Sequence, residues 1–349
     1  MRAFDYMVVP RELEDTSITN LLLFIRECKG KQDLWKETQP EVLASLLEVA
    51  KVQSTGASNR IEGIETTDKR LHDLVVKGDK PQTRAEEEIA GYRDALGLIH
   101  ERGDYMSLTP NVILQLHQIL MGHTRVQFAG KWKDSDNAIV ARNPDGTMYV
   151  RFRPTPALLT PTAVESACNA YREARSAEVC DPLLLSLRFL FDFVSIHPFN
   201  DGNGRVSRLL TVLLMEQNGY AVSKYISIER LIERNKALYY ESLADSSVGW
   251  NEGKNDEAPF VRYMLGMVVA AYRELSSRVE TRKQHGSRKS DAVYEVFKHR
   301  LGKITKAMIL EECPDISEIT VKRALSELLK QGIIEKVGNG PTAGYCLKG

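Results

Sequence analysis

Apolar residues recur at spacings of three and four along most of the chain, which is the pattern of helices that bury one face. Two such runs, SITNLLLFIREC (17–28) and PEVLASLLEVAK (40–51), lie near the N-terminus. The same pattern predicts further helices over residues 83–102, 109–121, 161–177, 182–196, 205–218 and 259–278. The pattern therefore predicts a mainly α-helical fold.

One segment departs from this pattern. In DNAIVARNPDGTMYVRF (136–152), two short strand-like runs flank the turn-forming residues Asn143, Pro144, Asp145 and Gly146. Asparagine, proline, aspartate and glycine favour tight turns, so the segment predicts a β-hairpin.

The C-terminal part has a different organisation. Residues 276–290 are polar and basic and predict a linker, and residues 291–349 read as helix (292–301), helix (303–313), helix (316–332) and strand–turn–strand (333–349). This order is typical of a winged helix-turn-helix. From Arg278 onward there are 14 Lys and Arg against 9 Asp and Glu. That surplus is compatible with DNA binding and equally with a docking or dimerisation module.

The composition narrows the functional classes to which this chain can belong. Lys plus Arg equals Asp plus Glu at 47 each, so overall charge favours neither nucleic acid nor membrane as a partner. The five cysteines include no C-x-x-C pair, and the seven histidines form no evident ligand cluster, which argues against a disulfide framework and a zinc enzyme. Without an apolar signal core or a run of membrane-spanning length, we expect a soluble, cytoplasmic protein with no membrane partner.

The stretch HPFNDGNGRVSR (197–208) combines groups that suit phosphate chemistry. His197 can act as a general base, and the backbone N–H groups of Gly202–Gly204, before a helix, can bind an anion. Asp201 offers a hard oxygen ligand for Mg²⁺. Arg205 and Arg208, three residues apart on a helix, could meet one polyphosphate. Together these groups indicate chemistry on a bound nucleoside triphosphate.

This stretch resembles the active-site signature of the Fic family, H-P-F-x-[DE]-G-N-G-R-x-x-R, at every specified position. LHQIL (116–120), GKWK (130–133) and the hairpin resemble the family segment that forms its flap, and Tyr225, Asn235 and Tyr239–Tyr240 fall where the family has its final core helices. Lys133 stands where relatives often carry arginine. The resemblance extends over about residues 31–270.

The resemblance implies a protein adenylyltransferase: AMP passes from ATP to a Ser, Thr or Tyr hydroxyl of a target protein, or of the protein itself. It implies His197 as the base and Asp201 as the Mg²⁺ ligand. The implied nucleotide-binding residues are Asn200, Gly202, Asn203, Gly204, Arg205, Arg208, Asn235 and Tyr239. The implied target-docking residues, which would pair with the target's backbone as an added strand, are Asn137, Ala138, Ile139 and Val140.

Upstream, SNRIEG (58–63) resembles the inhibitory motif of the family, [ST]-x-x-x-E-[GN]. Ser58 and Glu62 share a helix face at i, i+4, and Gly63 is suited to end that helix. The resemblance implies that Glu62 pairs bidentately with Arg208, so that this arginine is withheld from the γ-phosphate.

The sequence predicts an N-terminal helical region (1–100) that carries the inhibitory motif, a catalytic core (101–275), the linker (276–290) and the winged helix (291–349). Three alternatives stay open: removal of AMP by the same site, transfer of another nucleotide or phosphate group, and a nucleotide-sensing DNA-binding regulator. The apolar face of residues 17–28 is a candidate surface for a homodimer.

Overall fold

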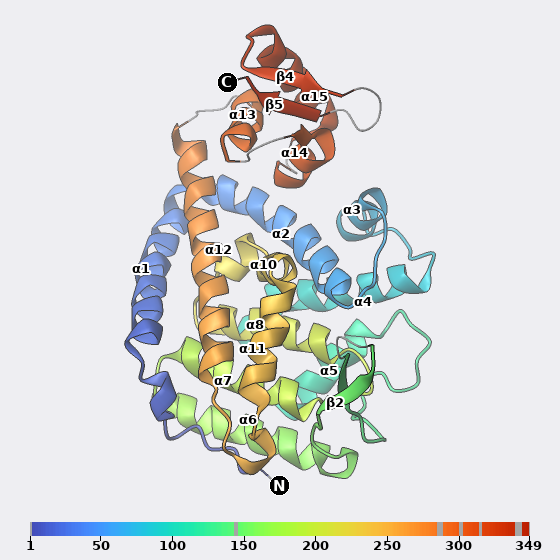
Figure 1. Ribbon diagram of the computed structural model, residues 1–349, viewed down its shortest axis with the longest axis vertical. Helices are drawn as coiled ribbons and strands as arrows, with labels where there is room; N and C mark the ends of the chain where they lie inside the picture. The colour runs from blue at the N-terminus through green and yellow to red at the C-terminus, as the bar shows by residue number, and fades with distance from the viewer. Residues whose placement is uncertain are drawn as a thin grey trace. The chain divides into compact units, whose positions relative to one another are not determined.

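The computed structural model describes residues 2–142, 146–284, 289–299, 303–313, 316–338 and 344–348 (Figure 1). It divides into two compact units. The first comprises Met1–Thr38 and Leu46–Glu274, and the second comprises Gln39–Ser45 and Leu275–Gly349. The expectation of a mainly helical fold with small antiparallel sheets is confirmed.

The N-terminal part of the chain is formed by helices that are longer than the pattern predicts. Polar Gln32 is fully buried and accepts a hydrogen bond from the Tyr272 hydroxyl, so helical structure continues past residue 28. Residues 54–59 are small or polar, yet all are buried, and tertiary packing overrides their weak helix propensity. The elements are η1 (Arg11–Leu13), α1 (Thr16–Thr38), α2 (Pro40–Ile61), α3 (Asp68–Val76) and α4 (Arg84–Arg102).

A buried helix, α7 (Pro182–Ile196), lies at the centre of the first unit. Thirteen of its fifteen residues are buried, as its nearly continuous apolar sequence requires. It packs against α6 (Thr160–Ser176) and α8 (Asn203–Gln217), and α8 also packs against α4 and α5 (Pro110–Leu120). The residues that follow α7 are therefore held by the core of this unit.

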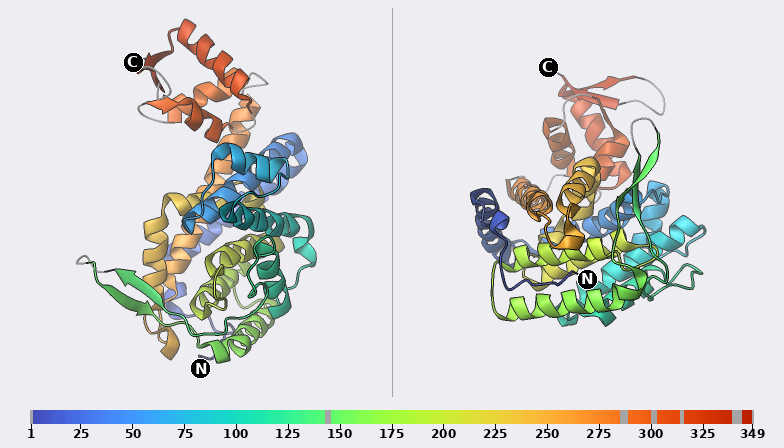
Figure 2. Two further views of the ribbon diagram at one scale, coloured as in Figure 1. Left: turned by 90° about the vertical axis from the view of Figure 1, so that its right-hand side faces the viewer. Right: turned by 60° about the horizontal axis from the view of Figure 1, so that its bottom comes forward.

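The predicted hairpin is present. Strands β1 (Ile139–Arg142) and β2 (Met148–Phe152) pair antiparallel, with a bulge between Ile139 and Val140. Figure 2 shows the hairpin, in green, standing out from the helices of its unit. Its predicted turn, residues 143–145, lies outside the described residues.

Several short elements connect the core helices of the first unit, and they are followed by α12, the longest of the described helices. Helix α12 contains residues 276–284, which the sequence placed in a linker, because Glu, Arg, Lys and Gln favour helix when it is already nucleated. The rest of that linker includes residues 285–288, which lie outside the described residues. The elements are η2 (Gly103–Tyr105), η3 (Ala157–Leu159), α9 (Val222–Tyr225), α10 (Ile228–Arg234), α11 (Lys236–Ser247), η4 (Trp250–Glu252) and α12 (Ala258–Gln284).

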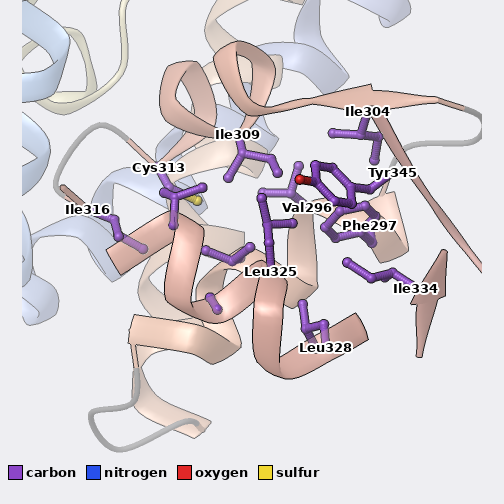
Figure 3. Close-up of a cluster of buried hydrophobic side chains, with 13 residues drawn as sticks. Val296, Phe297, Ile304, Ile309, Cys313, Ile316, Leu325, Leu328, Ile334 and Tyr345 are labelled. Carbon is purple, nitrogen blue, oxygen red and sulfur yellow. The ribbon is translucent and has the colours of Figure 1, made fainter. Parts of the chain in front are cut away.

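In the second unit, helices pack against a three-stranded antiparallel sheet with strand order β3-β5-β4. The prediction of one helix over residues 303–313 was wrong at its start, because Ile304 and Thr305 pair with β5 before Thr305 caps the next helix. Figure 3 shows the apolar core, in which Phe297, Leu325 and Tyr345 meet. The elements are α13 (Lys289–His299), β3 (Ile304–Thr305), α14 (Lys306–Glu312), α15 (Glu318–Lys330), β4 (Ile334–Val337) and β5 (Gly344–Leu347).

Among the described helices, none is both long enough and apolar enough to cross a lipid bilayer.

Candidate active site

The end of α7 places one histidine in an unusual backbone conformation. His197 caps the helix with φ 53° and ψ 62°, the left-handed region that few side chains adopt, and its N–H donates to the Phe193 carbonyl. Its ring Nδ1 lies 3.3 Å from the Val194 carbonyl oxygen. Because a carbonyl only accepts, Nδ1 carries the ring proton and Nε2 retains its lone pair.

The His197 imidazole is held in its neutral form. Burial is the main cause that lowers its pKa, the Val194 carbonyl acts in the opposite direction, and the positive charge of Lys133 adds to the lowering; the resulting pKa is about 4. At neutral pH the ring is therefore able to accept a proton.

The loop after His197 is rigid. The Asn203 side chain accepts from the Phe199 N–H at 2.8 Å and donates to the Phe199 carbonyl at 2.7 Å, so it closes the turn on both sides. Gly202 has φ +83°, which glycine adopts without strain, and α8 begins at the next residue. The first turn of α8 is thereby fixed beside the His197 ring.

A second histidine, His117, packs against this loop. Its ring stacks on Phe199 with centroids 3.8 Å apart. Nδ1 accepts from the Gly130 N–H at 3.0 Å, so Nε2 carries the proton and donates to the Asp201 carbonyl at 3.1 Å. Burial lowers the His117 pKa to about 4, which keeps this hydrogen-bonding pattern at neutral pH. The sequence pattern gave no sign of this role.

Lys133 connects the hairpin to the same loop. Its backbone N–H donates to the Pro198 carbonyl, and its buried Nζ donates to the Ile196 carbonyl at 3.2 Å and to Asn137 Oδ1 at 3.0 Å. Burial lowers the pKa of Lys133 to about 8. Lys133 stands where relatives often carry arginine. Its compact ammonium lies between the carbonyl before His197 and the base of the hairpin.

Arg208 is almost fully buried and contacts the predicted inhibitory motif. Its Nε donates to Ser58 Oγ at 2.8 Å, and its Nη2 donates to the Ser58 carbonyl at 2.9 Å and to Glu62 Oε1 at 2.7 Å. The predicted bidentate pair with Glu62 was wrong, because Ser58 takes Nε and shares Nη2, which leaves the carboxylate a single donor. Helix α2 ends at Ile61, and Gly63 has φ +79°, as the motif predicts.

The Glu62 carboxylate lies at the N-terminus of α8. A Cβ built on Gly204 would collide with Glu62 Oε1 and would come within 3.3 Å of Arg208 Nη1. The absence of a side chain at Gly204 therefore lets an anion approach the helix backbone and the guanidinium at the same place. In this structure the anion is Glu62.

A cavity of about 460 Å³ joins these groups. His197, Gly204, Arg208 and Glu62 line one part of it. The remaining lining residues come from the hairpin, α7, α11 and their connections: Ile139, Val140, Arg151, Phe152, Val194, Ser195, Tyr239, Tyr240, Leu243 and Ser247.

The two arginines of the motif are directed to different partners. Arg205 is 1% exposed, and its Nη1 pairs with Glu88 Oε2 of α4 at 2.6 Å. Its Nη2 lies 3.6 Å from Asp201 Oδ1. In this structure a neighbouring helix supplies Arg205 with a carboxylate, and the expectation that both cations meet one polyphosphate stays a prediction for Arg205. Arg208 alone of the two lines the cavity.

The remaining predicted residues differ in how closely they approach the cavity. Tyr239 lines it, whereas Asn235 precedes α11 and donates to the Leu231 carbonyl. Asn200 Nδ2 donates to Asp134 Oδ1 at 3.2 Å.

Among the target-docking residues, Ile139 and Val140 line the cavity and Val140 is half exposed. Asn137 faces inward and donates to the Phe199 carbonyl. Ala138 is exposed immediately before β1.

Asp201 is the predicted ligand for Mg²⁺. Its side chain is 53% exposed, and Oδ1 accepts from the Gly202 N–H at 2.6 Å. Among the described residues, no three His, Cys, Asp or Glu side chains gather to hold a metal. One accessible carboxylate at a helix N-terminus fits Mg²⁺ that is otherwise bound by phosphates and water.

Comparison with known proteins relates this geometry to a family. A profile of the Fic/DOC family matches residues 107–215. A Fido domain-containing protein of Dictyostelium discoideum is 33% identical over 116 residues, which are 31% of this chain and 78% of that protein. The chain belongs to the Fic/DOC family.

Relatives of this Fic protein include proteins named protein adenylyltransferase Fic. That of Nematostella vectensis is 27% identical over 182 residues, 51% of this chain and 36% of the relative. That of Aedes aegypti is 28% identical over 181 residues, 51% of this chain and 31% of the relative. The chain thus spans about a third of the length of these relatives.

The fold of this Fic protein is shared with solved structures. A Fic family protein from Desulfovibrio desulfuricans has a TM-score of 0.63 at 22% identity, over 96% of this chain and 97% of that chain. A Fic domain-containing signaling protein from Bacteroides thetaiotaomicron has a TM-score of 0.61 at 22% identity, over 74% of this chain and 97% of that chain.

Proposed function

We propose that this protein is a protein adenylyltransferase that transfers AMP from ATP to a hydroxyl side chain of a protein, and that Glu62 inhibits it. One observation carries the proposal: the neutral base His197 and an anion position made by Gly204 and Arg208 line one cavity, and a carboxylate of the same chain takes the anion position.

In the proposed reaction, the target hydroxyl oxygen bonds to the α-phosphorus as the bond from that phosphorus to pyrophosphate breaks. His197 Nε2 accepts the hydroxyl proton, and the electron pair of the broken bond leaves with pyrophosphate. Gly204 and the neighbouring N–H groups hold phosphate oxygens, while Arg208 neutralises the outer phosphates. Asp201 would hold Mg²⁺, which when bound would supply positive charge that stabilises the phosphates.

The proposed inhibition follows from competition for the same position. Glu62 pairs with Arg208 and approaches the α8 backbone at Gly204. While it does so, the γ-phosphate meets a like charge and has no free guanidinium, so the triphosphate is displaced from the in-line geometry that transfer needs. The same carboxylate could also serve AMP removal, which stays an open alternative.

We further propose that the target docks on the hairpin as an added strand. In the described part of the hairpin, β1 pairs with β2 along one edge, and Ile139 and Val140 lie over the cavity. Backbone pairing with β1 would present a hydroxyl of the target to His197 with little dependence on the target's sequence.

We expect transfer to depend on pH through His197. Because burial lowers its pKa to about 4, the ring is neutral above about pH 5 and becomes protonated below it. The rate should therefore stay nearly constant between pH 8 and pH 6 and fall below pH 5, as the base is lost. The transfer rate of an uninhibited variant as a function of pH, and an NMR titration of the His197 ring, measure this pH dependence. The ring signal is assigned by its loss in His197→Asn. A titration midpoint near the unperturbed value of about 6.5 would contradict it.

Two labels of ATP test the reaction itself. With Mg²⁺ and an uninhibited variant, label from [α-³²P]ATP should appear on protein, label from [γ-³²P]ATP should not, and chelation of Mg²⁺ by EDTA should abolish the signal. Appearance of the γ-label on protein would indicate that the enzyme transfers a phosphate group and not AMP. Labelling from UTP but not ATP would indicate another nucleotide. No label from any donor, with lysate added as target, would favour the regulatory alternative.

We propose a winged helix for the C-terminal part, residues 291–349. Three helices that share one apolar core with the strand order β3-β5-β4 support this proposal. DNA binding by this part and a homodimer through residues 17–28 stay predictions of the sequence.

A further inference from the structure

Lys133 contacts the carbonyl groups of the two residues that flank His197. Its backbone N–H donates to the Pro198 carbonyl at 2.9 Å, and its side-chain Nζ donates to the Ile196 carbonyl at 3.2 Å. Ile196 is the last residue of α7, so its carbonyl has no partner within that helix. One residue therefore holds the backbone both before and after the histidine.

These contacts lie where the backbone needs support. His197 has φ 53° and ψ 62°, a conformation that costs free energy and persists only where the surroundings fix it. The peptide group between Ile196 and His197 is held at both ends, because its N–H donates to the Phe193 carbonyl at 3.1 Å while its oxygen accepts from Lys133. Since a peptide group is planar, these two bonds fix the direction in which the His197 side chain leaves the backbone.

The same side chain reaches the base of the hairpin. Lys133 Nζ donates to Asn137 Oδ1 at 3.0 Å, and Asn137 Nδ2 donates to the Phe199 carbonyl at 3.3 Å. Strand β1 begins shortly after Asn137, at Ile139. The start of this strand and the backbone of the histidine are thus joined through one nitrogen atom.

Burial makes the contacts of Nζ obligatory. Lys133 is 4% exposed, and a buried donor that loses its acceptor is costly. Burial lowers the pKa of Lys133 to about 8, against the opposing effect of the Asp136 charge. The neutral amine still carries enough N–H groups for both acceptors. The link therefore persists in either protonation state.

We propose that Lys133 is a positioning residue that joins the backbone of His197 to the start of β1, and so sets the distance between the base and a target docked on the hairpin. This inference rests on the proposed function, because it takes His197 as the base and the hairpin as the docking strand. Lys133 does not line the cavity, so it acts through these backbone groups and not on the nucleotide.

Transfer and nucleotide binding should respond differently to the loss of this link. In a Glu62→Gly background, Lys133→Met should slow single-turnover AMP transfer about 10-fold, because it removes a charge-assisted hydrogen bond from the peptide group before His197. The calorimetric Kd for ATP should not change. Lys133→Arg, which keeps a cation with several N–H donors, should retain most of the transfer.

Lys29→Met is the matched control. It removes another lysine Nζ that donates to a backbone carbonyl, that of Asn218, at 2.9 Å. It should change neither the transfer rate nor the Kd for ATP. The proposal is overturned if Lys133→Met transfers AMP as fast as Lys29→Met, or if it weakens ATP binding by the same factor by which it slows transfer.

A measurement without nucleotide separates this inference from the proposed function. In the otherwise wild-type chain, the amide N–H of His197 should exchange with solvent at least several-fold faster in Lys133→Met than in Lys29→Met, whereas amides in the middle of α7 should keep their rates. Equal exchange at His197, or equal acceleration throughout α7, would overturn the proposal even if AMP transfer is observed.

Faster exchange at His197 with no AMP transfer would support Lys133 as the residue that holds this backbone, and would refute the adenylyltransferase. Lys133→Gln serves both tests if Lys133→Met does not fold, because its end group is polar but shorter and uncharged.

Discussion

Replacing Glu62 with glycine should raise the rate of AMP transfer by about 100-fold, the factor that ~2.7 kcal/mol represents at the barrier. A charge-assisted hydrogen bond of this kind contributes ~1.5–3 kcal/mol, and the carboxylate also repels the triphosphate from the same position. The variant removes both effects, since Glu62 is the anion at Arg208 and Gly204. Initial rates with α-labelled ATP at saturating ATP and Mg²⁺ measure the change.

Glu65→Gly is the control for this substitution. Glu65 is an exposed carboxylate three residues further along the same segment, so its replacement introduces the same backbone freedom and the same change in net charge. It should leave the rate unchanged. If Glu62→Gly transfers AMP no faster than wild type, inhibition by Glu62 is refuted. Acceleration by both variants would indicate a general loosening of the end of α2.

Loss of the base should have an effect of similar or greater size in the opposite direction. In the Glu62→Gly background, His197→Ala should lower AMP transfer by about 1,000-fold, within the range of 10²–10⁴ that general bases contribute. Binding of ATP should be nearly unchanged, because the groups that hold the phosphates are Gly204 and Arg208. Single-turnover labelling and calorimetry separate the two quantities.

The backbone at His197 calls for a second variant. Alanine at φ 53° is strained, whereas asparagine adopts the left-handed region more readily and still cannot act as a base. His197→Asn should therefore lose transfer as fully as His197→Ala while it retains the thermal stability of the parent. Transfer within 10-fold of the parent in His197→Asn would exclude His197 as the base.

The sequence could predict those features that depend on neighbours along the chain. The apolar run of α7 was recognisable because all but four of its fifteen residues are apolar, and the helix has the predicted bounds. The turn that follows could be expected because glycine tolerates the positive φ found at Gly202. The spacing of Ser58, Glu62 and Gly63 likewise predicts a helix end that carries a carboxylate.

The division of labour between Arg205 and Arg208 could not be predicted in this way. Their spacing on α8 suggests one shared role. Their partners come from other helices, however: Glu88 of α4 neutralises Arg205, whereas Ser58 and Glu62 meet Arg208. Two cations of one motif are thus distinguished by residues more than 100 positions away.

The sequence by itself determined a mainly helical chain, a base at the end of a buried helix, an anion position at the start of the next helix, and a candidate inhibitory carboxylate. Local spacing suffices for these, because helix periodicity and turn conformation depend on nearby residues. Only the tertiary structure decided that Ser58 prevents a bidentate pair with Arg208 and that Glu88 neutralises Arg205. Buried charges must find partners wherever packing provides them, and packing brings together segments whose separation along the chain carries no such information.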